Sequence, residues 1–339
     1  AREAVERAFE LQPDLAEAHF AMGYYYYHGF RDDENALQEW ALAEQGMPGD
    51  SRVHLARGYL YRRMGNFEQS LVSLDRAIEL DPRNIEQLEV QAISYALLHD
   101  YARAESFFDR IIEIAPDRPL GYRNKARISL WRDGDVSSMN AILESAPIEV
   151  PAPVLEWTTA LYERSYEAAL TALNNRFDNW EMETVDTAWI YRPKASYYGV
   201  THELAEEPEL AAQQFRAARK EVDQALESRP DDPRVIIALA EILARQGERE
   251  LAANLARHAM ELFPMARDAS GGPGAFNLPL NAIRVFVAAE DYDAAIEAFE
   301  VYLAAPVLWS IEGLLPDPRL DPIRDDPRFQ AFVEKYKRK

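Results

Sequence analysis

Small and bulky apolar residues recur along this chain in a fixed frame. A small residue is followed four positions later by a bulky apolar residue, three further on by a small or apolar residue, and about five after that by proline. Positions i, i+4 and i+7 share one face of an α-helix, so each occurrence predicts a helix with a buried stripe that ends at its proline. The frame fits Ala1, Val5, Ala8 and Pro13; Ala36, Trp40, Ala43 and Pro48; Ser70, Leu74, Ala77 and Pro82; Ala104, Phe108, Ile111 and Pro116; Ala218, Val222, Ala225 and Pro230; Ala252, Ala256, Ala259 and Pro264; and, one residue shorter, Ala295, Phe299, Tyr302 and Pro306.

The prolines that end these helices are evenly spaced. Pro48, Pro82 and Pro116 lie 34 residues apart, and so do Pro230 and Pro264. A period of this length accommodates two helices and two turns, and such a unit buries its apolar face only against its neighbours. The spacing therefore predicts an array of stacked helical hairpins.

The predicted corners between the two helices of each hairpin carry their own signature. Glycine adopts the left-handed backbone conformation of a tight corner without steric cost, and Asn or Asp tolerates it. In the preceding helices a small residue stands three positions before a tyrosine, as with Gly23 and Tyr26 or Gly58 and Tyr61. The predicted corners are Gly65-Asn66-Phe67, His99-Asp100-Tyr101, Asp133-Gly134-Asp135, Gln246-Gly247-Glu248 and Glu290-Asp291-Tyr292.

The frame and corners together resemble the tetratricopeptide repeat family over nearly the whole chain, with a weaker fit at 119–215. The resemblance implies an all-α fold: a right-handed α-α superhelix with irregular central repeats and a C-terminal helical cap. It also implies a scaffold that binds proteins or peptides, and not an enzyme.

Three stretches of the C-terminal half are similar to a narrower group. Glu206–Ala212, Arg229–Arg234 and above all Asp317–Phe329 resemble the C-terminal repeat region of bacterial multidomain signalling proteins. The N-terminal parts of those proteins are winged-helix regulators, class III adenylate or guanylate cyclases, or Ser/Thr kinases, often with a TolB-like domain between. The resemblance implies that this chain is the interaction or sensory module of such a protein.

The frame divides the chain into segments. Residues 1–13 are predicted to form the second helix of a truncated repeat, which indicates a fragment of a longer protein. Residues 14–149 are expected to form an N-terminal array, and 150–232 to hold degenerate and long helical repeats. Residues 233–308 are expected to form C-terminal pairs, and 309–339 a capping tail.

Asp-Pro pairs punctuate this tail. Asp favours the N-cap position and Pro the first helical position, so each pair predicts the start of a short helix. An array of hairpins also needs an end unit that covers its last apolar face. The pairs are Asp317-Pro318, Asp321-Pro322 and Asp326-Pro327, and the apolar residues expected to cover the end are Leu320, Ile323, Phe329, Phe332, Val333 and Tyr336.

The net charge and the absence of cysteine argue against several kinds of partner and binding site. A formal net charge of -21 repels phosphate backbones, so we expect no nucleic acid partner for this chain. Without cysteine there are no disulfides and no thiolate zinc sites, and both the cytoplasm and the periplasm stay open as compartments. No apolar run approaches about 18 residues, which predicts no membrane span.

Catalytic and metal-site patterns are weak. The six histidines include no pair at the spacing of a helical zinc motif, and we interpret His19 and His54 as packing residues. The pair Asp32-Asp33 is interpreted as a helix cap or solvated charge. The glycine-rich stretch 270–274 lacks the spacing and the lysine of a phosphate loop. We therefore predict no catalytic residues, no metal and no cofactor.

The first helices of the hairpins are the predicted binding surface, because they line the concave face of such an array. The helical phase set by Gly23 and Gly58 places aromatic and arginine side chains there, and these residue types are common binding anchors. Phe20 and Tyr24 replace the Lys and Asn of the family's carboxylate clamp, so we expect a peptide with acidic and aromatic or apolar residues. The predicted groove residues are Phe20, Tyr24, Tyr27, Tyr59, Arg62, Arg63, Arg123, Arg127 and Trp131.

Other interpretations stay open. The predicted groove side chains could only pack against the next repeat. The array could self-associate and dimerise its parent protein. A third hypothesis is a small-molecule sensor, with a pocket at the irregular middle, where we expect one helix to carry Trp189, Tyr191, Tyr197 and Tyr198.

Overall fold

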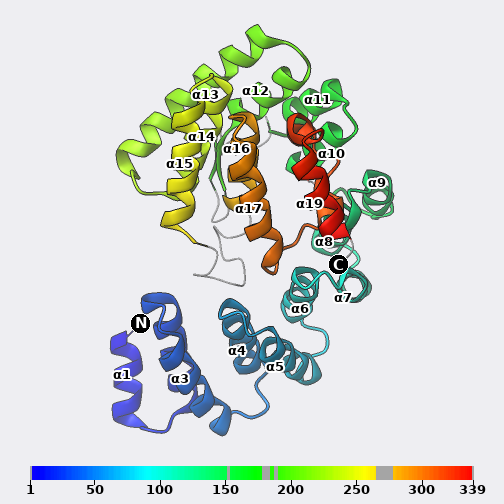
Figure 1. Cartoon of the computed structure of the whole chain (residues 1–339). Helices are drawn as coiled ribbons and strands as arrows, with labels where there is room; N and C mark the ends of the chain where they lie inside the picture. The colour runs from blue at the N-terminus through cyan, green and yellow to red at the C-terminus, as the bar shows by residue number, and fades with distance from the viewer. Residues whose placement is uncertain (1, 151–152, 178–183, 187–189, 265–277, 338–339) are drawn as a thin grey trace. The chain divides into compact units, whose positions relative to one another are not determined.

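A computed structural model of the chain is almost entirely helical (Figure 1). This confirms the all-α repeat fold. The described part consists of residues 2–150, 153–177, 184–186, 190–264 and 278–337.

The chain forms two compact units. Unit 1 comprises Ala1–Ala96 and Ala102–Ala115, and unit 2 comprises Leu97–Tyr101 and Pro116–Lys339. Each unit is built from antiparallel helical hairpins in which consecutive helices pack side by side.

Unit 1 contains a single helix followed by three hairpins. In the first hairpin, helix α2 continues into a π-helical turn, η1, whose C-cap residue Arg31 has a φ of 55°. The elements are α1 (Arg2–Leu11), α2 (Ala16–Tyr24), η1 (Tyr25–Phe30), α3 (Asp33–Gly46), α4 (Ser51–Arg63), α5 (Phe67–Leu80), α6 (Ile85–Leu97) and α7 (Tyr101–Ile114).

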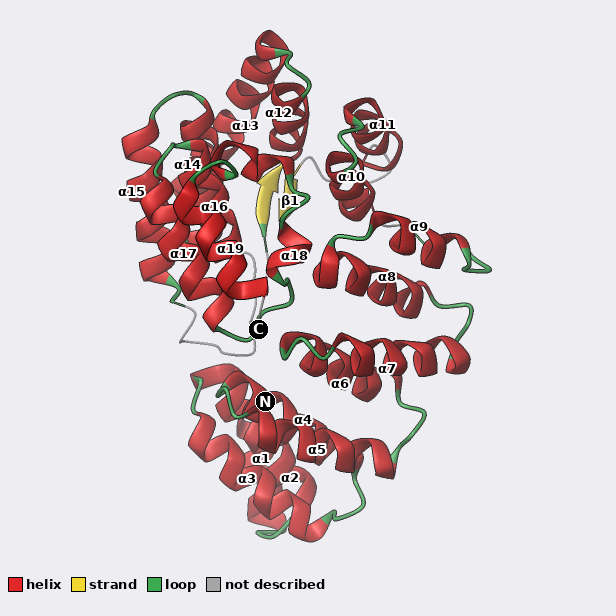
Figure 2. Cartoon of the chain, turned by 45° about the vertical axis from the view of Figure 1, so that its right-hand side comes forward, coloured by secondary structure: helices red, strands yellow, loops and turns green. Residues whose placement is uncertain are grey.

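The described residues of unit 2 form five helical hairpins, one short β-hairpin and a C-terminal segment. Figure 2 colours these helices and strands by type. In the β-hairpin, β1 (Thr184–Asp186) pairs antiparallel with β2 (Tyr191–Pro193). The helices are α8 (Pro119–Asp133), α9 (Val136–Glu144), α10 (Pro153–Tyr162), α11 (Tyr166–Phe177), α12 (Lys194–Leu204), α13 (Pro208–Ser228), α14 (Pro233–Arg245), α15 (Arg249–Leu262), α16 (Leu278–Ala288), α17 (Tyr292–Ala304), α18 (Ile311–Leu314), the 3-10 helix η3 (Pro318–Ile323) and α19 (Pro327–Lys337).

The predicted stripes are the cores of the hairpins. Trp40, Leu74 and Phe108 have no exposed surface in unit 1, and Val222 and Phe299 have none in unit 2. The small residues of the frame allow the partner helix to approach closely. At Gly58, for example, an added Cβ would lie 2.6 Å from a methyl carbon of Leu74.

Every described hairpin has a left-handed residue at its corner, which confirms the predicted turns. The five predicted corners use Gly65, His99, Gly134, Gly247 and Glu290. At the two predicted corners without glycine, His99 and Glu290 take the left-handed position, and each is followed by an Asp that is available as a cap. Asp291, for example, accepts a hydrogen bond from the backbone N–H of Ala294 at 3.2 Å.

The expectation of one long helix carrying Tyr191, Tyr197 and Tyr198 is wrong for its first part. Tyr191 lies in β2, and α12 begins only at Lys194. The reason is Pro193, which is extended with φ -56° and ψ 142° and has no N–H to continue a helix backwards. Trp189 and the stretch 270–274 lie outside the described residues.

Two of the three Asp-Pro pairs start helices as predicted. Asp317 caps η3 and Asp326 precedes α19, and each carboxylate accepts a hydrogen bond from a backbone N–H two residues on. The prediction is wrong for Asp321, because Pro322 lies inside η3. A 3-10 turn of six residues tolerates proline there more readily than an α-helix would.

Candidate protein-interaction surfaces

The first-helix face of unit 1 is formed by α2, α4 and α6 and carries a group of half-buried aromatic rings. The ring of Phe20 packs edge-to-face against Tyr24, with centroids 5.1 Å apart. The guanidinium of Arg52 lies 5.5 Å from the centroid of Phe20. Arg52 was not among the predicted groove residues, although its position three residues before Leu55 on the same helix face was the signal for it.

Arginine and acidic residues complete this face. The guanidinium of Arg62 lies 5.4 Å from the ring centroid of Tyr59 and donates to the carbonyl oxygen of Val90 at 3.3 Å. Burial raises the pKa of Tyr59, opposed by Arg62 and reinforced by Glu86 and Glu89. Arg62 therefore ties α4 to α6 as well as contributing charge to the face.

Tyr24 belongs to the same face. Burial is the main cause of its raised pKa, and Glu86 adds to the shift while Arg52 opposes it. Residues from three successive first helices thus act on one another electrostatically. Three of the predicted residues, Phe20, Tyr24 and Tyr59, are brought together here with charges of both signs.

Arg63 and Tyr27 sit deeper than the rest of the predicted set. Arg63 is only 7% exposed and forms an ion pair with Asp33 of α3. Its guanidinium lies 4.2 Å from the ring centroid of Tyr27. Both residues contribute to the packing of neighbouring hairpins.

The remaining predicted residues lie on α8, in unit 2. Arg123 and Arg127 are half-buried, and Arg127 donates to the side-chain oxygen of Asn124 at 3.1 Å. Trp131 is 8% exposed, and its carbonyl oxygen accepts a hydrogen bond from the backbone N–H of Ser310 at 2.8 Å. The C-terminal segment thus contacts the end of α8.

That segment, residues 307–323, is here named the strap. Its α18 packs against α8, and its η3 packs against α16. Tyr101 donates through its hydroxyl to the carbonyl oxygen of Leu308 at 2.9 Å, and Arg164 donates to that of Pro316 at 2.6 Å. The strap therefore covers first helices of unit 2, a position that sequence periodicity did not predict.

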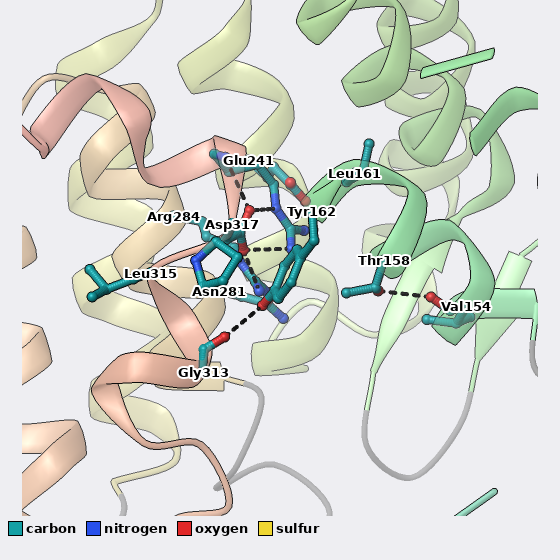
Figure 3. Close-up of polar contacts among 12 residues, drawn as sticks. Val154, Thr158, Leu161, Tyr162, Glu241, Asn281, Arg284, Gly313, Leu315 and Asp317 are labelled. Carbon is teal, nitrogen blue, oxygen red and sulfur yellow. Dashed lines mark hydrogen bonds and ion pairs between the residues drawn. The ribbon is translucent and has the colours of Figure 1, made fainter. Parts of the chain in front are cut away.

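The centre of the strap is a buried carboxylate (Figure 3). Asp317 has no exposed surface and accepts hydrogen bonds from Arg284 of α16 at 2.9 Å and from Arg319 at 2.7 Å. Burial alone would raise the pKa of Asp317, but the guanidinium groups of Arg319 and Arg284 outweigh it and hold the pKa well below its usual range. The folded state thus keeps this side chain ionised.

A second buried group of charges lies between β2, α12 and α14. Arg192 of β2 is ion-paired with Glu241 of α14, and Arg245 with Glu203 of α12. The guanidinium of Arg192 lies 5.1 Å from the ring centroid of Tyr197, which is 1% exposed. Tyr197 is therefore a core residue.

Metal-holding clusters and membrane-spanning helices are both absent from the described residues. Among them, no group of three or more His, Asp or Glu side chains could hold a metal ion, and no helix is long and apolar enough to cross a bilayer. His54 is buried, and His19 lies 2.7 Å from a carboxylate oxygen of Glu39, so both pack as interpreted from the sequence.

Segments in both units match a known repeat family. The family model for the tetratricopeptide repeat matches residues 55–119 and 209–266. Among solved structures, the chain is similar to a tetratricopeptide repeat protein from Parabacteroides merdae, with 11% identity over 95% of this chain and 98% of that one and a TM-score of 0.40. It is also similar to PilW, described as a widely conserved type IV pilus biogenesis factor, with 13% identity over 74% and 94% of the two chains and a TM-score of 0.38. No curated protein matches the chain.

Proposed function

We propose that this chain, a tetratricopeptide repeat protein, binds a peptide segment of a protein partner through the first-helix face of unit 1. Proteins built from this repeat generally act as protein-interaction scaffolds. The observation that carries the proposal is the gathering of Phe20, Tyr24 and Tyr59 with Arg52 and Arg62 on one half-exposed face.

The chemistry of this face favours a particular class of segment. Aromatic rings offer apolar area at low cost in conformational entropy, and arginine pairs with carboxylates. Arg52 and Arg62 flank the rings, while Glu86 and Glu89 border them on α6. A segment with an aromatic or apolar anchor beside an acidic residue would pack on the rings and place its negative charge near these two guanidinium groups, which already have partners within the chain.

We also propose that the chain serves as a module of a larger signalling protein. The resemblance of Asp317–Phe329 to bacterial signalling proteins supports a role as their interaction module. The alternative that the module dimerises its parent rests on no feature of the unit 1 face.

A peptide-display selection on the full chain tests the proposal. We expect enrichment of segments that combine acidic and aromatic residues, with binding at least tenfold weaker for the triple variant Arg52→Ala, Tyr59→Ala, Arg62→Ala. The matched control is Leu42→Ala, Val72→Ala, which truncates exposed apolar residues on the second helices α3 and α5. Selected peptides that bind the triple variant as tightly as the native chain would overturn the proposal, provided that circular dichroism shows both variants folded.

A further inference from the structure

The strap is held on unit 2 in the way that a bound peptide is held. Its backbone supplies acceptors to Tyr101, Tyr162 and Arg164, which contact the carbonyl oxygens of Leu308, Gly313 and Pro316. Such contacts to the main chain position a segment, and one side chain then fixes its register. In the strap that side chain is Asp317.

Asp317 belongs to an Asp-x-Arg motif that caps helices at three other, less buried positions of the chain. In Asp50-Ser51-Arg52, Asp232-Pro233-Arg234 and Asp326-Pro327-Arg328, the Asp caps a helix and the Arg two residues on chelates the same carboxylate. In the strap the motif is buried, and the carboxylate gains Arg284 from α16 as a third ligand. This additional contact comes from a side chain of another helix, which is how a binding site holds a bound peptide.

Removal of the strap would leave Arg284 of α16 without its ion-pair partner. Its side chain is 11% exposed, and its ion pair with Asp317 supplies the neutralising charge. If the strap leaves, Asp317 leaves with it, and Arg284 loses its carboxylate and must be hydrated again. Re-occupation of the face by a copy of the strap restores that ion pair.

The connection to the strap permits exchange. Between the end of α17 at Ala304 and the start of the strap at Val307 the backbone is not helical, and Ala305 is extended with φ -92° and ψ 161°. A hinge of this kind allows a C-terminal arm to leave its own unit and enter another, which restores every contact that it made before. The exchanged arm includes α19, whose Phe329 and Phe332 pack on Phe299 of α17.

We propose that the strap is an exchangeable ligand, and that the first-helix face of unit 2 also accepts the strap of a second copy of this chain. Asp317 of each copy then pairs with Arg284 of the other in a reciprocal dimer. The closed monomer and the exchanged dimer have the same contacts, so protein concentration sets their ratio. The proposal is independent of the binding face of unit 1.

Cross-linking between single-cysteine variants tests it, because the native chain has no cysteine. Arg164 and Asp321 form an exposed ion pair between unit 2 and the strap, with 2.9 Å between nitrogen and oxygen. The full-length double variant Arg164→Cys, Asp321→Cys should cross-link within one chain when treated with a short bis-maleimide. Arg164→Cys mixed with Asp321→Cys should cross-link between chains, in a yield that rises with protein concentration.

The control pair is Asp321→Cys mixed with Glu250→Cys, which places the second thiol at an exposed position on α15. We expect the strap pair to exceed this background at least tenfold after prolonged incubation at high concentration. Interchain yield equal to the background, with the double variant cross-linked normally, would overturn the exchange. Failure of the double variant to cross-link would overturn the strap's position itself.

Discussion

The hydroxyl of Tyr162, at the end of α10, donates a hydrogen bond of 3.1 Å to the carbonyl oxygen of Gly313 in the strap (Figure 3). The two residues are 151 positions apart in the sequence. This contact and the ion pair between Arg284 and Asp317 hold the C-terminal segment against α10, from the middle of the chain, and against α16. The stability of unit 2 should therefore depend strongly on a few strap residues.

Replacing Asp317 with Asn should destabilise unit 2 severely. The change leaves Arg284 and Arg319 buried without their carboxylate, and breaking a buried pair in this way costs about 3–5 kcal/mol. Urea titration, with hydrogen exchange of α16 as the local probe, measures the loss. Asp326→Asn is the matched control, because it removes the same capping motif at the surface and should cost far less. Equal losses for the two variants would contradict this account.

Lowering the pH should remove the stabilisation that the ionised Asp317 provides. The pKa of Asp317 is lowered in the folded state, so its ionised form stabilises the fold fully above its usual pKa of about 4 and progressively less below it. Between about pH 5 and pH 2 the stability of the native chain should fall more steeply than that of Asp317→Asn. Urea midpoints measured across this range test the sign, and parallel curves for the two proteins would refute it.

Gly313 should not tolerate a methyl group. An added Cβ would collide with the carbonyl oxygens of Leu130 and Trp131, which are backbone atoms that cannot turn aside. We expect Gly313→Ala to cost about 1–3 kcal/mol by overpacking. Gly49→Ala has open space around its Cβ and should leave the thermal midpoint nearly unchanged. A Gly313→Ala protein as stable as the native chain would show that α18 does not pack on α8 as described.

Replacing Arg63 should lower the stability of unit 1 more directly than it affects the binding of a partner. Its buried guanidinium pairs with Asp33 and stacks on Tyr27, so we expect Arg63→Ala to destabilise unit 1 by about 2–4 kcal/mol. Arg52→Ala, at an exposed ion pair, should cost less than about 1 kcal/mol. Thermal unfolding of both variants separates packing residues from surface residues within the predicted binding set. A larger loss of stability for Arg52→Ala than for Arg63→Ala would indicate that Arg63 lies on the surface.

Much of the fold followed from local pattern alone. The repeated frame identified the buried stripes around Trp40 and Leu74, and the corner residues Gly65 and Gly247 were read directly from the turns. These features depend on contacts within one hairpin or with the next, so the 34-residue period carries the information.

The residues of the candidate site could be predicted only in part from the repeat pattern. Helical phase placed Tyr24 and Tyr59 on one face of unit 1, but it did not show that Arg63 is buried. Nor did it predict β2, because Pro193 and the strand partner override the helical expectation around Tyr191. Burial of a long side chain depends on which neighbour covers it, and period alone does not specify that.

The sequence by itself determined the hairpins, their corners and the capping role of Asp317 and Asp326, since all of these are set by residues a few positions apart. Only the tertiary structure decided that Asp317 is buried against Arg284 while Asp326 stays in a surface cap. The two motifs are nearly identical along the chain. What separates them is Arg284, a neighbour on another helix 33 residues earlier in the chain. The local motif is the same at both sites and does not specify which side chain of a neighbouring helix will cover it.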